Sequence, residues 1–185
     1  TGGSSGIGFA VAHELLRIGF RVTLIARRRP ALEIAQQDLT ERTRDTVAQP
    51  GIAIVSADVA NADSVSAAFR TVVESDGPFQ VVFHGAGVAY PDYFLSIPKD
   101  QLDQALDINL RGTWNVLHAA AAIWGERGDP VQSVDGSEPS KRDRRVRAHG
   151  RRGHRLIRSV DAGWRHVVTV SSMAGLIPVY GYSAY

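Results

Sequence analysis

The sequence predicts an α/β fold with a doubly wound parallel sheet that is incomplete at both ends. A Gly/Ser-rich turn over residues 1–8 runs directly into a helical pattern of apolar residues. Short β-branched runs then alternate with helical segments, which is the order that builds a parallel sheet with helices on both faces. At 185 residues, 44% of them hydrophobic, the chain suits a single domain over 1–185 with its own core.

The first half of the chain supplies two helices and two strands. Apolar residues recur at helical spacing from Ile7 to Ile18, and Gly19 can end that helix. The β-branched run over 21–26 predicts a buried strand. An exposed amphipathic helix is expected over 31–47, followed by a strand over 52–56.

The second half continues the alternation. A helix capped by Asn61 or Asp63 is expected to run to about residue 75. Buried strands are expected over 79–83 and, after a long interruption, a β-branched strand over 166–170. Between them, residues 100–124 read as one or two helices.

The opening turn, Thr1-Gly2-Gly3-Ser4-Ser5-Gly6-Ile7-Gly8, has the composition of a phosphate-binding turn at a helix N-terminus. Gly2 can adopt the backbone angles of a sharp turn, and Gly6 leaves room for a diphosphate. Gly8 lets the helix pack close to a sheet. An ordinary loop is the alternative. The predicted cofactor-binding residues here are Gly2, Ser4, Ser5, Gly6, Ile7 and Gly8.

Two arginines after the 21–26 strand indicate the cofactor. In a dinucleotide-binding fold, this position faces the adenosine ribose, where an acidic residue favours a 2′-hydroxyl and an arginine favours a 2′-phosphate. The chain has Arg27 and Arg28 here and no acidic residue, so NADP(H) is the predicted cofactor. A solvated charge cluster before a helix is the alternative.

Two further strand ends carry candidate cofactor contacts. Asp58-Val59 ends the 52–56 strand, where the carboxylate can accept a hydrogen bond from an adenine amino group or act as a turn residue. The small residues Gly85, Ala86 and Gly87 follow the 79–83 strand and allow a ligand to approach the backbone closely.

Three residues are candidates for catalysis. Asn109 lies between Ile108 and Leu110 in a helical pattern, where it is either solvent-facing or part of a buried polar site. Ser172 follows a strand, and Tyr185 lies thirteen residues later. A hydroxyl and a phenol that converge on one carbonyl oxygen can orient it and protonate it.

The tract over residues 125–165 interrupts the pattern. It is rich in Gly, Pro, Ser, Asp and Arg, and it is far longer than the usual connection of about 2–8 residues, so a disordered insertion is expected. Nine basic residues between 141 and 158 account for the net charge of +2, because the remainder holds 12 basic and 18 acidic residues. No nucleic-acid partner is therefore inferred.

Other functional classes find little support. The chain has no cysteine, and His149 and His154 lie in the polar tract as solvated residues, so no metal site is predicted. No apolar run reaches the roughly 20 residues that a membrane span needs.

Together, TGGSSGIG at 1–8, Asp58-Val59, Asn109 within D-I-N-L-R-G, and Ser172 with Tyr185 resemble the short-chain dehydrogenase/reductase family outside residues 125–165. The resemblance implies a Rossmann-type fold. It also implies that Tyr185 is the general acid/base, that Ser172 positions the substrate carbonyl and that Asn109 holds a water in a proton relay.

The sequence departs from that family in two ways. An asparagine usually stands where this chain has His84, which puts a backbone-stabilising hydrogen bond in doubt. The family's lysine, four residues after its tyrosine, would lie beyond residue 185, and its first strand would precede Thr1. The chain is therefore expected to be a fragment that is inactive by itself.

Within the family, TGGSSGIG, V-T-L-I-A-R, G-V-A-Y-P-D-Y-F and G-Y-S-A-Y are similar to 3-ketodihydrosphingosine (3-dehydrosphinganine) reductases. That similarity implies NADPH-dependent reduction of a lipid ketone at the cytosolic face of the endoplasmic reticulum. The alternatives are a general short-chain alcohol dehydrogenase, a 3-oxoacyl reductase, or a non-catalytic nucleotide-binding protein. Whether the protein forms a homo-oligomer stays open. The apolar Tyr93, Phe94, Leu176, Ile177 and Val179 near the expected site would suit a lipid chain or pack as an ordinary lid.

Overall fold

The computed structural model describes residues 1–45, 51–126 and 165–172. The described helices are α1 (Gly6–Arg17), α2 (Arg29–Thr43), α3 (Ala62–Asp76), α4 (Lys99–Ala105) and α5 (Gly112–Glu126), with a 3-10 turn η1 (Phe94–Ser96) and a π-helical segment η2 (Leu106–Arg111). The described strands are β1 (Val22–Ala26), β2 (Ile52–Ser56), β3 (Val81–His84) and β4 (His166–Thr169). The predicted alternation of helices and strands is confirmed, with boundaries that shift by a few residues.

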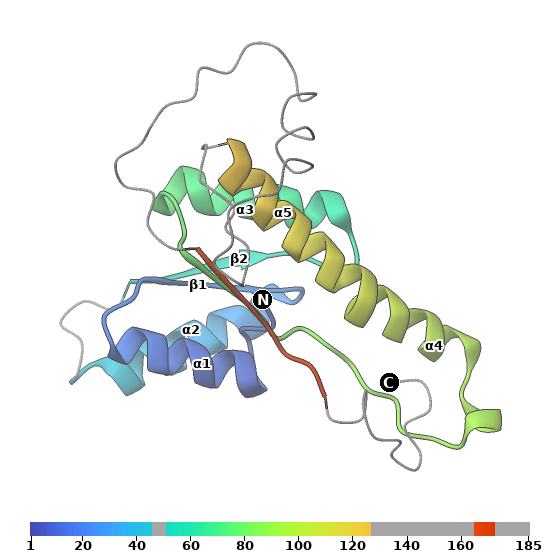
Figure 1. Cartoon of the computed structure of the whole chain (residues 1–185). Helices are drawn as coiled ribbons and strands as arrows, with labels where there is room; N and C mark the ends of the chain where they lie inside the picture. Colours follow the sequence, from blue (N-terminus) through green and yellow to red (C-terminus); the bar gives the residue numbers. More distant parts are fainter. Residues whose placement is uncertain (46–50, 127–164, 173–185) are drawn as a thin grey trace, which may run out of the picture.

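The described strands form two parallel pairs. β1 pairs with β2, with Val22 opposite Ile52, and β3 pairs with β4, with Val81 opposite His166. Helices α1 and α2 lie on one side of the strands, and α3 and α5 lie on the other (Figure 1). This is the α/β layering that the sequence predicts.

A slot separates the two strand pairs, so the described strands do not form one continuous sheet. The slot has a volume of about 850 Å³ and is lined by β1, β3 and α1. The first residues of the chain cross its carboxyl end: the Gly3 N–H donates to the Ile25 carbonyl at 3.3 Å, and the Gly85 N–H donates to the Thr1 carbonyl at 3.1 Å. The start of the chain thus ties β1 to β3 where no described strand lies between them.

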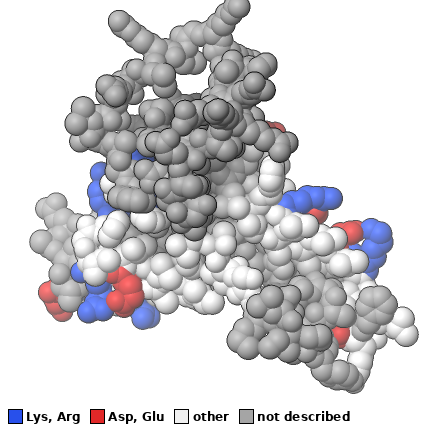
Figure 2. All heavy atoms as spheres, in the orientation of Figure 1, with Lys and Arg blue, Asp and Glu red and all other residues white. Residues whose placement is uncertain are grey.

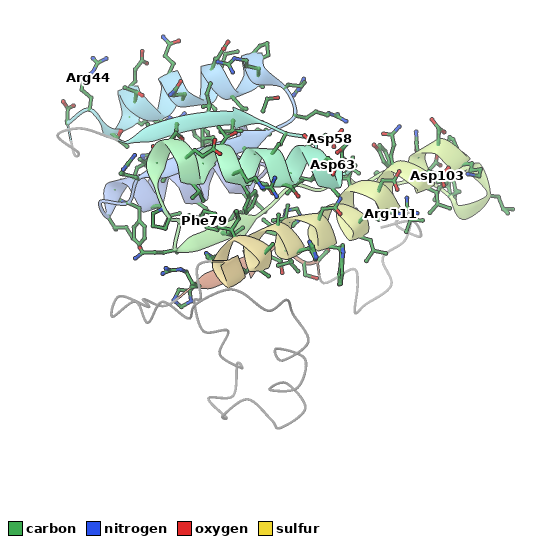
Figure 3. The ribbon with its side chains drawn as sticks, turned by 90° about the horizontal axis from the view of Figure 1, so that it is seen from above. Arg44, Asp58, Asp63, Phe79, Asp103 and Arg111 are labelled. Atoms are coloured by element: carbon green, nitrogen blue, oxygen red, sulfur yellow. The ribbon has the colours of Figure 1, made fainter. Side chains whose placement is uncertain are left out.

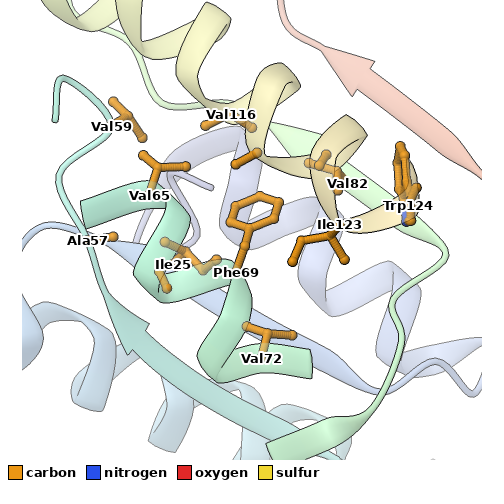
Figure 4. Packing of buried hydrophobic residues seen from close by; sticks show 13 residues of the cluster. Ile25, Ala57, Val59, Val65, Phe69, Val72, Val82, Val116, Ile123 and Trp124 are labelled. Atoms are coloured by element: carbon orange, nitrogen blue, oxygen red, sulfur yellow. The ribbon is translucent and has the colours of Figure 1, made fainter. Parts of the chain in front are cut away.

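Each face of the strands has its own apolar core. The core among α1, α2 and β1 contains the fully buried Leu16, Leu24, Leu32 and Leu39. The core between α3 and α5 includes Ile25 and Val82 from the strands beneath them (Figure 4). These two cores fix the strand ends relative to the helices that follow them.

An aromatic contact anchors the end of α5. The Phe79 ring stands edge-on to Phe69 with ring centroids 5.3 Å apart, and its centroid lies 5.4 Å from that of Trp124. The Trp124 indole N–H also donates to the Phe79 carbonyl at 3.1 Å. This anchor holds the last described turns of α5, which extend past the expected end at residue 124, against the strand side of the molecule.

The segment predicted as one or two helices is one helical path with a π-helical middle. α4 leads directly into η2, which leads directly into α5. Asn109 lies within η2. Short π-helical segments inserted in α-helices occur frequently at functional sites.

No helix in the described ranges is both long enough and apolar enough to cross a bilayer. On the face shown in Figure 2, basic and acidic side chains lie together toward two ends of the molecule, with uncharged residues between them. Ion pairs such as Arg42–Asp38 and Lys99–Asp103 account for this mixing of signs.

Candidate functional site

The candidate site residues of the first strand pair leave the strands at one edge. β1 is followed at once by Arg27 and Arg28, and β2 is followed by Asp58 and Val59. Because β1 and β2 are parallel, the two segments lie at the same end. Figure 3 shows Asp58 at this end and Phe79 toward the other. Ligands of open α/β sheets bind at the carboxyl edge.

The second strand pair ends beside the first. The loop over 85–87 follows β3, and the Val170 N–H after β4 donates to the His84 carbonyl at 3.0 Å. Ser172 comes two residues after Val170. The start of the chain contacts the carboxyl ends of both β1 and β3, so the two pairs share one edge.

The glycine-rich turn packs closely against the protein and leaves the start of α1 open. Gly2 has a φ of +70°, and a Cβ there would lie 2.7 Å from the Ala86 nitrogen, so only glycine lets the turn approach the 85–87 loop. A Cβ on Gly8 would lie 2.3 Å from the Gly2 carbonyl oxygen. Gly6 has a φ of +56°, and its Cβ direction is open space. The turn is therefore closed toward the protein and open beside the N-terminus of α1.

The serines and Ile7 of this turn lie beside that opening. Ser5 is the N-cap residue of α1, but its side chain makes no capping hydrogen bond. Ser4 is half-buried, and the Ile7 side chain is exposed. A hydroxyl that does not cap its own helix is available to an anion at the helix N-terminus.

Arg27 and Arg28 are exposed at the end of β1. The Arg27 carbonyl accepts a hydrogen bond from the Ser56 hydroxyl at 2.9 Å, which ties the ends of β1 and β2 together. Arg29 pairs with Glu33 at 3.0 Å, whereas Arg27 and Arg28 have no ion-pair partner within the described ranges. Their guanidinium groups are thus the ones available for a phosphate.

Asp58 acts as a turn residue, which is one of the two roles that the sequence left open. Its Oδ1 accepts a hydrogen bond from the Ala60 N–H at 3.0 Å, and its own N–H donates to the Ser64 hydroxyl at 3.1 Å. Asn61, and not Asp63, caps α3 by accepting from the Ser64 N–H at 2.9 Å. The turn holds the end of β2 in a fixed position.

Helix α5 fastens the turn that contains Val59. Val59 is buried, and its carbonyl accepts a hydrogen bond from the Asn115 side-chain amide at 2.9 Å. Gly112 allows this approach, because a Cβ there would lie 2.9 Å from a Val59 methyl group. The first turns of α5 therefore position the end of β2.

Asn109 fastens the other loop. Its Oδ1 accepts a hydrogen bond from the Val88 N–H at 2.9 Å, and its Nδ2 donates to the Val88 carbonyl at 2.8 Å. A Cβ on Gly87 would lie 3.3 Å from the Asn109 Oδ1. The sequence allowed Asn109 to be either solvent-facing or part of a buried polar site. The structure shows a partly buried polar site, in which the side-chain amide is bonded to the backbone.

His84 replaces the asparagine expected after the strand, and it still fastens the strand end. Its ring is buried, with Nδ1 2.6 Å from the Thr1 hydroxyl and Nε2 3.1 Å from the Thr113 hydroxyl. Burial, and then the Thr1 ammonium group, lowers the pKa of His84 to about 4. The His84 ring bonds to two side-chain hydroxyls and to no backbone group in these two contacts, so it does not reproduce the backbone-stabilising bond of the expected asparagine.

Several predicted residues lie outside the described ranges. These are Tyr185, the apolar Leu176, Ile177 and Val179, the histidines His149 and His154, and residues 127–164 of the predicted insertion. Ser172 is described and is half-buried. The described residues thus include the predicted cofactor-binding residues, Asn109 and Ser172, but not Tyr185.

Sequence reasoning missed Thr113 and Asn115, and it treated His84 only as a departure. All three bond to groups far away in the chain, such as Val59 for Asn115 and Thr1 for His84. One sequence signal for Thr113 and Asn115 was available: they are polar residues on either side of Trp114, near an otherwise apolar helix start. Trp114 itself is exposed. Such polar residues often satisfy buried backbone groups.

Comparisons with known proteins identify the family of the chain. The family model described as short chain dehydrogenase matches residues 1–139. An uncharacterized oxidoreductase of Mycobacterium bovis is 35% identical over 127 residues, which are 69% of this chain and 49% of its own length. A 3-dehydrosphinganine reductase of Arabidopsis thaliana is 35% identical over 129 residues, 70% of this chain and 37% of its own length. The chain thus matches half or less of the length of these relatives.

Solved structures share the fold. An actinorhodin polyketide ketoreductase variant with NADPH aligns with a TM-score of 0.72 and 20% identity, over 100% of this chain and 56% of its own. A xylitol dehydrogenase bound to NAD⁺ aligns with a TM-score of 0.73 and 21% identity, over 100% of this chain and 55% of its own.

Proposed function

The chain belongs to the short-chain dehydrogenase family, and from this membership we propose that it is part of an NADPH-dependent reductase that converts a ketone to a secondary alcohol. The observation that carries the proposal is the contact between the Gly2 turn and the 85–87 loop, which leaves the N-terminus of α1 open at the strand ends. A diphosphate fits beside such a helix start. The relatives named as oxidoreductases support this reading.

The cofactor is assigned to named residues of this chain. Gly2, Ser4, Ser5, Gly6, Ile7 and Gly8 are proposed to hold the diphosphate. Arg27 and Arg28 are exposed, and neither has an ion-pair partner in the described ranges, so they are proposed to hold a 2′-phosphate. Asp58 and Val59 are proposed to contact the adenine, and Gly85, Ala86 and Gly87 the nicotinamide half. When bound, NADPH supplies the hydride for the reduction.

The proton that the ketone oxygen receives is assigned to side chains of this chain. Ser172 is proposed to donate a hydrogen bond to the substrate carbonyl oxygen, and the Tyr185 phenol is proposed to give that oxygen its proton. Both polar atoms of the Asn109 side-chain amide are bonded to Val88, so the proposed role of holding a relay water is given to its backbone carbonyl, which also accepts from Thr113. By the family resemblance, a lysine completes this relay.

The proposed substrate is a long-chain ketone of the 3-dehydrosphinganine type, which is reduced at the cytosolic face of the endoplasmic reticulum. The similarity to the plant reductase supports this choice. Tyr93 and Leu95, in the loop between β3 and α4, have side chains 63% and 94% exposed, as a surface that receives a lipid chain requires. The uncharacterized bacterial relative of equal identity keeps a general short-chain reductase as a second candidate.

One experiment tests both the activity and the substrate class. The full-length protein is incubated with NADPH and either 3-dehydrosphinganine or a short soluble ketone, and oxidation of NADPH is followed by absorbance. Turnover with the lipid ketone alone supports the sphingoid assignment, whereas turnover with the short ketone favours the general reductase. NADPH binding without turnover on any ketone would favour a non-catalytic nucleotide-binding protein.

A further inference from the structure

The buried ring of His84 links three parts of the chain. It lies at the end of β3 with 2% of its surface exposed. One ring nitrogen bonds to the Thr1 hydroxyl in the opening turn, and the other bonds to the Thr113 hydroxyl in α5. The ring thus bridges the glycine turn, the strand and the helix.

These hydrogen bonds define the protonation state and tautomer of the His84 ring. The Thr113 hydroxyl has one proton, and it donates that proton to the Asn109 carbonyl at 2.6 Å. The hydroxyl must therefore accept from His84, so Nε2 carries the ring proton. Nδ1 is then unprotonated and accepts from the Thr1 hydroxyl at 2.6 Å. Every polar atom in this chain of bonds is satisfied only by the neutral, Nε2-protonated ring.

The same turn of helix fastens the loop after His84 at both ends. At the first end, His84 reaches the Asn109 carbonyl through Thr113. At the second end, the Asn109 amide makes two bonds to Val88. The loop over 85–87 thus lies between these two attachments, and both lead to Asn109 in η2.

The loop has little room to move. A Cβ on Gly2 would lie 2.7 Å from the Ala86 nitrogen, and one on Gly87 would lie 3.3 Å from the Asn109 Oδ1. Loss of either attachment would let the loop shift against the glycine turn, and a small shift alters a close-fitting ligand site.

We propose that His84 is a positioning residue, which acts through Thr113 to hold the 85–87 loop against Asn109 for the nicotinamide half of a dinucleotide. The inference rests on the proposed function, and it deepens that function by assigning a role to a residue that departs from the family pattern. His84 contacts neither reacting group.

Two pairs of variants of the full-length protein test this role. His84→Gln places an amide donor close to the position of Nε2, whereas His84→Asn reaches only the position of Nδ1. Thr113→Ser keeps the hydroxyl, and Thr113→Val removes it with little change of shape. Gln36→Ala removes one side-chain bond to the Ile52 carbonyl, at the opposite end of β2, and serves as the control for stability.

The readouts are NADPH affinity by fluorescence titration, kcat and KM, melting temperature, and the tautomer of His84 by NMR of the ligand-free protein. H84N and T113V are expected to lose about tenfold in NADPH affinity and in kcat, with ketone KM changed less than about twofold. H84Q and T113S should stay within about threefold of wild type. Combining H84N with T113V should cost no more than either change alone.

Each outcome either supports or overturns the positioning role of His84. Equal NADPH affinity in all variants, an Nδ1-protonated ring, or losses that match those of Gln36→Ala would overturn the positioning role while the proposed function stands. A wild-type protein that binds neither NADPH nor NADH would overturn the proposed function and this inference together. If H84N does not fold, the comparison of T113V with T113S gives the same decision.

Discussion

The side-chain amide of Asn109 bonds both backbone groups of a single distant residue, Val88, at 2.9 Å and 2.8 Å. This pair fixes the loop after β3 to the π-helical segment. It also occupies the polar atoms of an amide that the family resemblance assigns to catalysis. The side chain of Asn109 therefore holds the loop after β3, and a water-holding role for its backbone carbonyl, which also accepts from the Thr113 hydroxyl, stays a proposal.

Replacing Asn109 by Ala should reduce activity through the loop. The change leaves both backbone groups of Val88 without these partners, which costs about 1–3 kcal/mol of unfolding free energy. NADPH affinity and kcat are expected to fall more than in Gln36→Ala, which loses a bond of the same type far from the strand ends. Urea unfolding and steady-state kinetics on both variants measure this. Equal activity losses in the two would contradict the role of Asn109.

Arg27→Ala should weaken the preference for NADPH over NADH. A charge-assisted bond between guanidinium and a 2′-phosphate contributes about 2 kcal/mol, so the affinity ratio should fall about thirtyfold. The matched control is Arg29→Ala, because Arg29 is engaged with Glu33. An unchanged ratio of the two dissociation constants in Arg27→Ala would show that Arg27 does not bind the phosphate.

Stability should fall as the pH drops toward 4, because of His84. Its pKa is lowered to about 4 in the folded protein, against about 6.5 in an unfolded chain. Between these values the unfolded chain binds more protons, so the contribution is complete above pH 6.5 and is lost as pH falls, by about 3 kcal/mol in total.

Urea unfolding between pH 4 and pH 7 measures this loss, with H84Q as the variant that lacks the titrating ring. The Thr1 amino group also has a pKa lowered, to about 5, by burial, but it is present in both proteins, so the difference between their pH dependences reports His84. Parallel pH dependences in wild type and H84Q would contradict the assignment to His84.

The sequence predicted the elements well because each depends on local pattern. The 52–56 strand was predicted with the observed bounds, since a β-branched run between a glycine and a small polar turn leaves little choice. Gly2 was interpreted correctly as a sharp-turn residue, whereas Gly8, expected to pack against a sheet, packs against the backbone of Gly2 and Gly3. The glycine turn and the strand ends therefore emerged from the sequence alone.

The attachments between these elements were not predictable in the same way. The bonds from His84 to Thr113 and from Asn115 to Val59 join residues 29 and 56 positions apart, so no local pattern signals them. The π-helical segment around Asn109 was missed because its apolar spacing still fits an ordinary helix. The sequence left Asp58 with a turn role or an adenine contact; the bond from the Ala60 N–H shows the turn role, and the adenine contact stays a proposal.

In a protein that extends the chain at both ends, Tyr185→Phe should abolish ketone reduction without weakening NADPH binding. The phenol is the proposed proton donor, and its ordinary pKa of about 10 requires a nearby cation to bring it toward neutrality. By the family resemblance, that cation is a lysine, which Tyr185→Phe leaves in place. Single-turnover kinetics and NADPH titration test this, and ketone reduction by Tyr185→Phe at the wild-type rate would refute it.

A β-strand added before Thr1 should stabilise the protein by filling the slot between β1 and β3. Both strands line this space, together with Ile18 and Phe20, which are 70% and 40% exposed. Residues 1–3 already cross the carboxyl end of the slot, with bonds to Ile25 and from Gly85. A segment directly before Thr1 would thus enter the slot and could pair with the facing edges of both strands.

The size of the effect follows from the apolar surface that the added strand covers. Two or three large apolar side chains buried there contribute about 5 kcal/mol, which corresponds to a rise in melting temperature of about 10–20 °C for a protein of this size. A five-residue Val/Ile-rich extension is compared with a Gly/Ser extension of the same length by thermal unfolding. Because the Gly/Ser segment has no apolar side chains, it should give little stabilisation, and equal melting temperatures for the two extended proteins would rule out a strand in the slot.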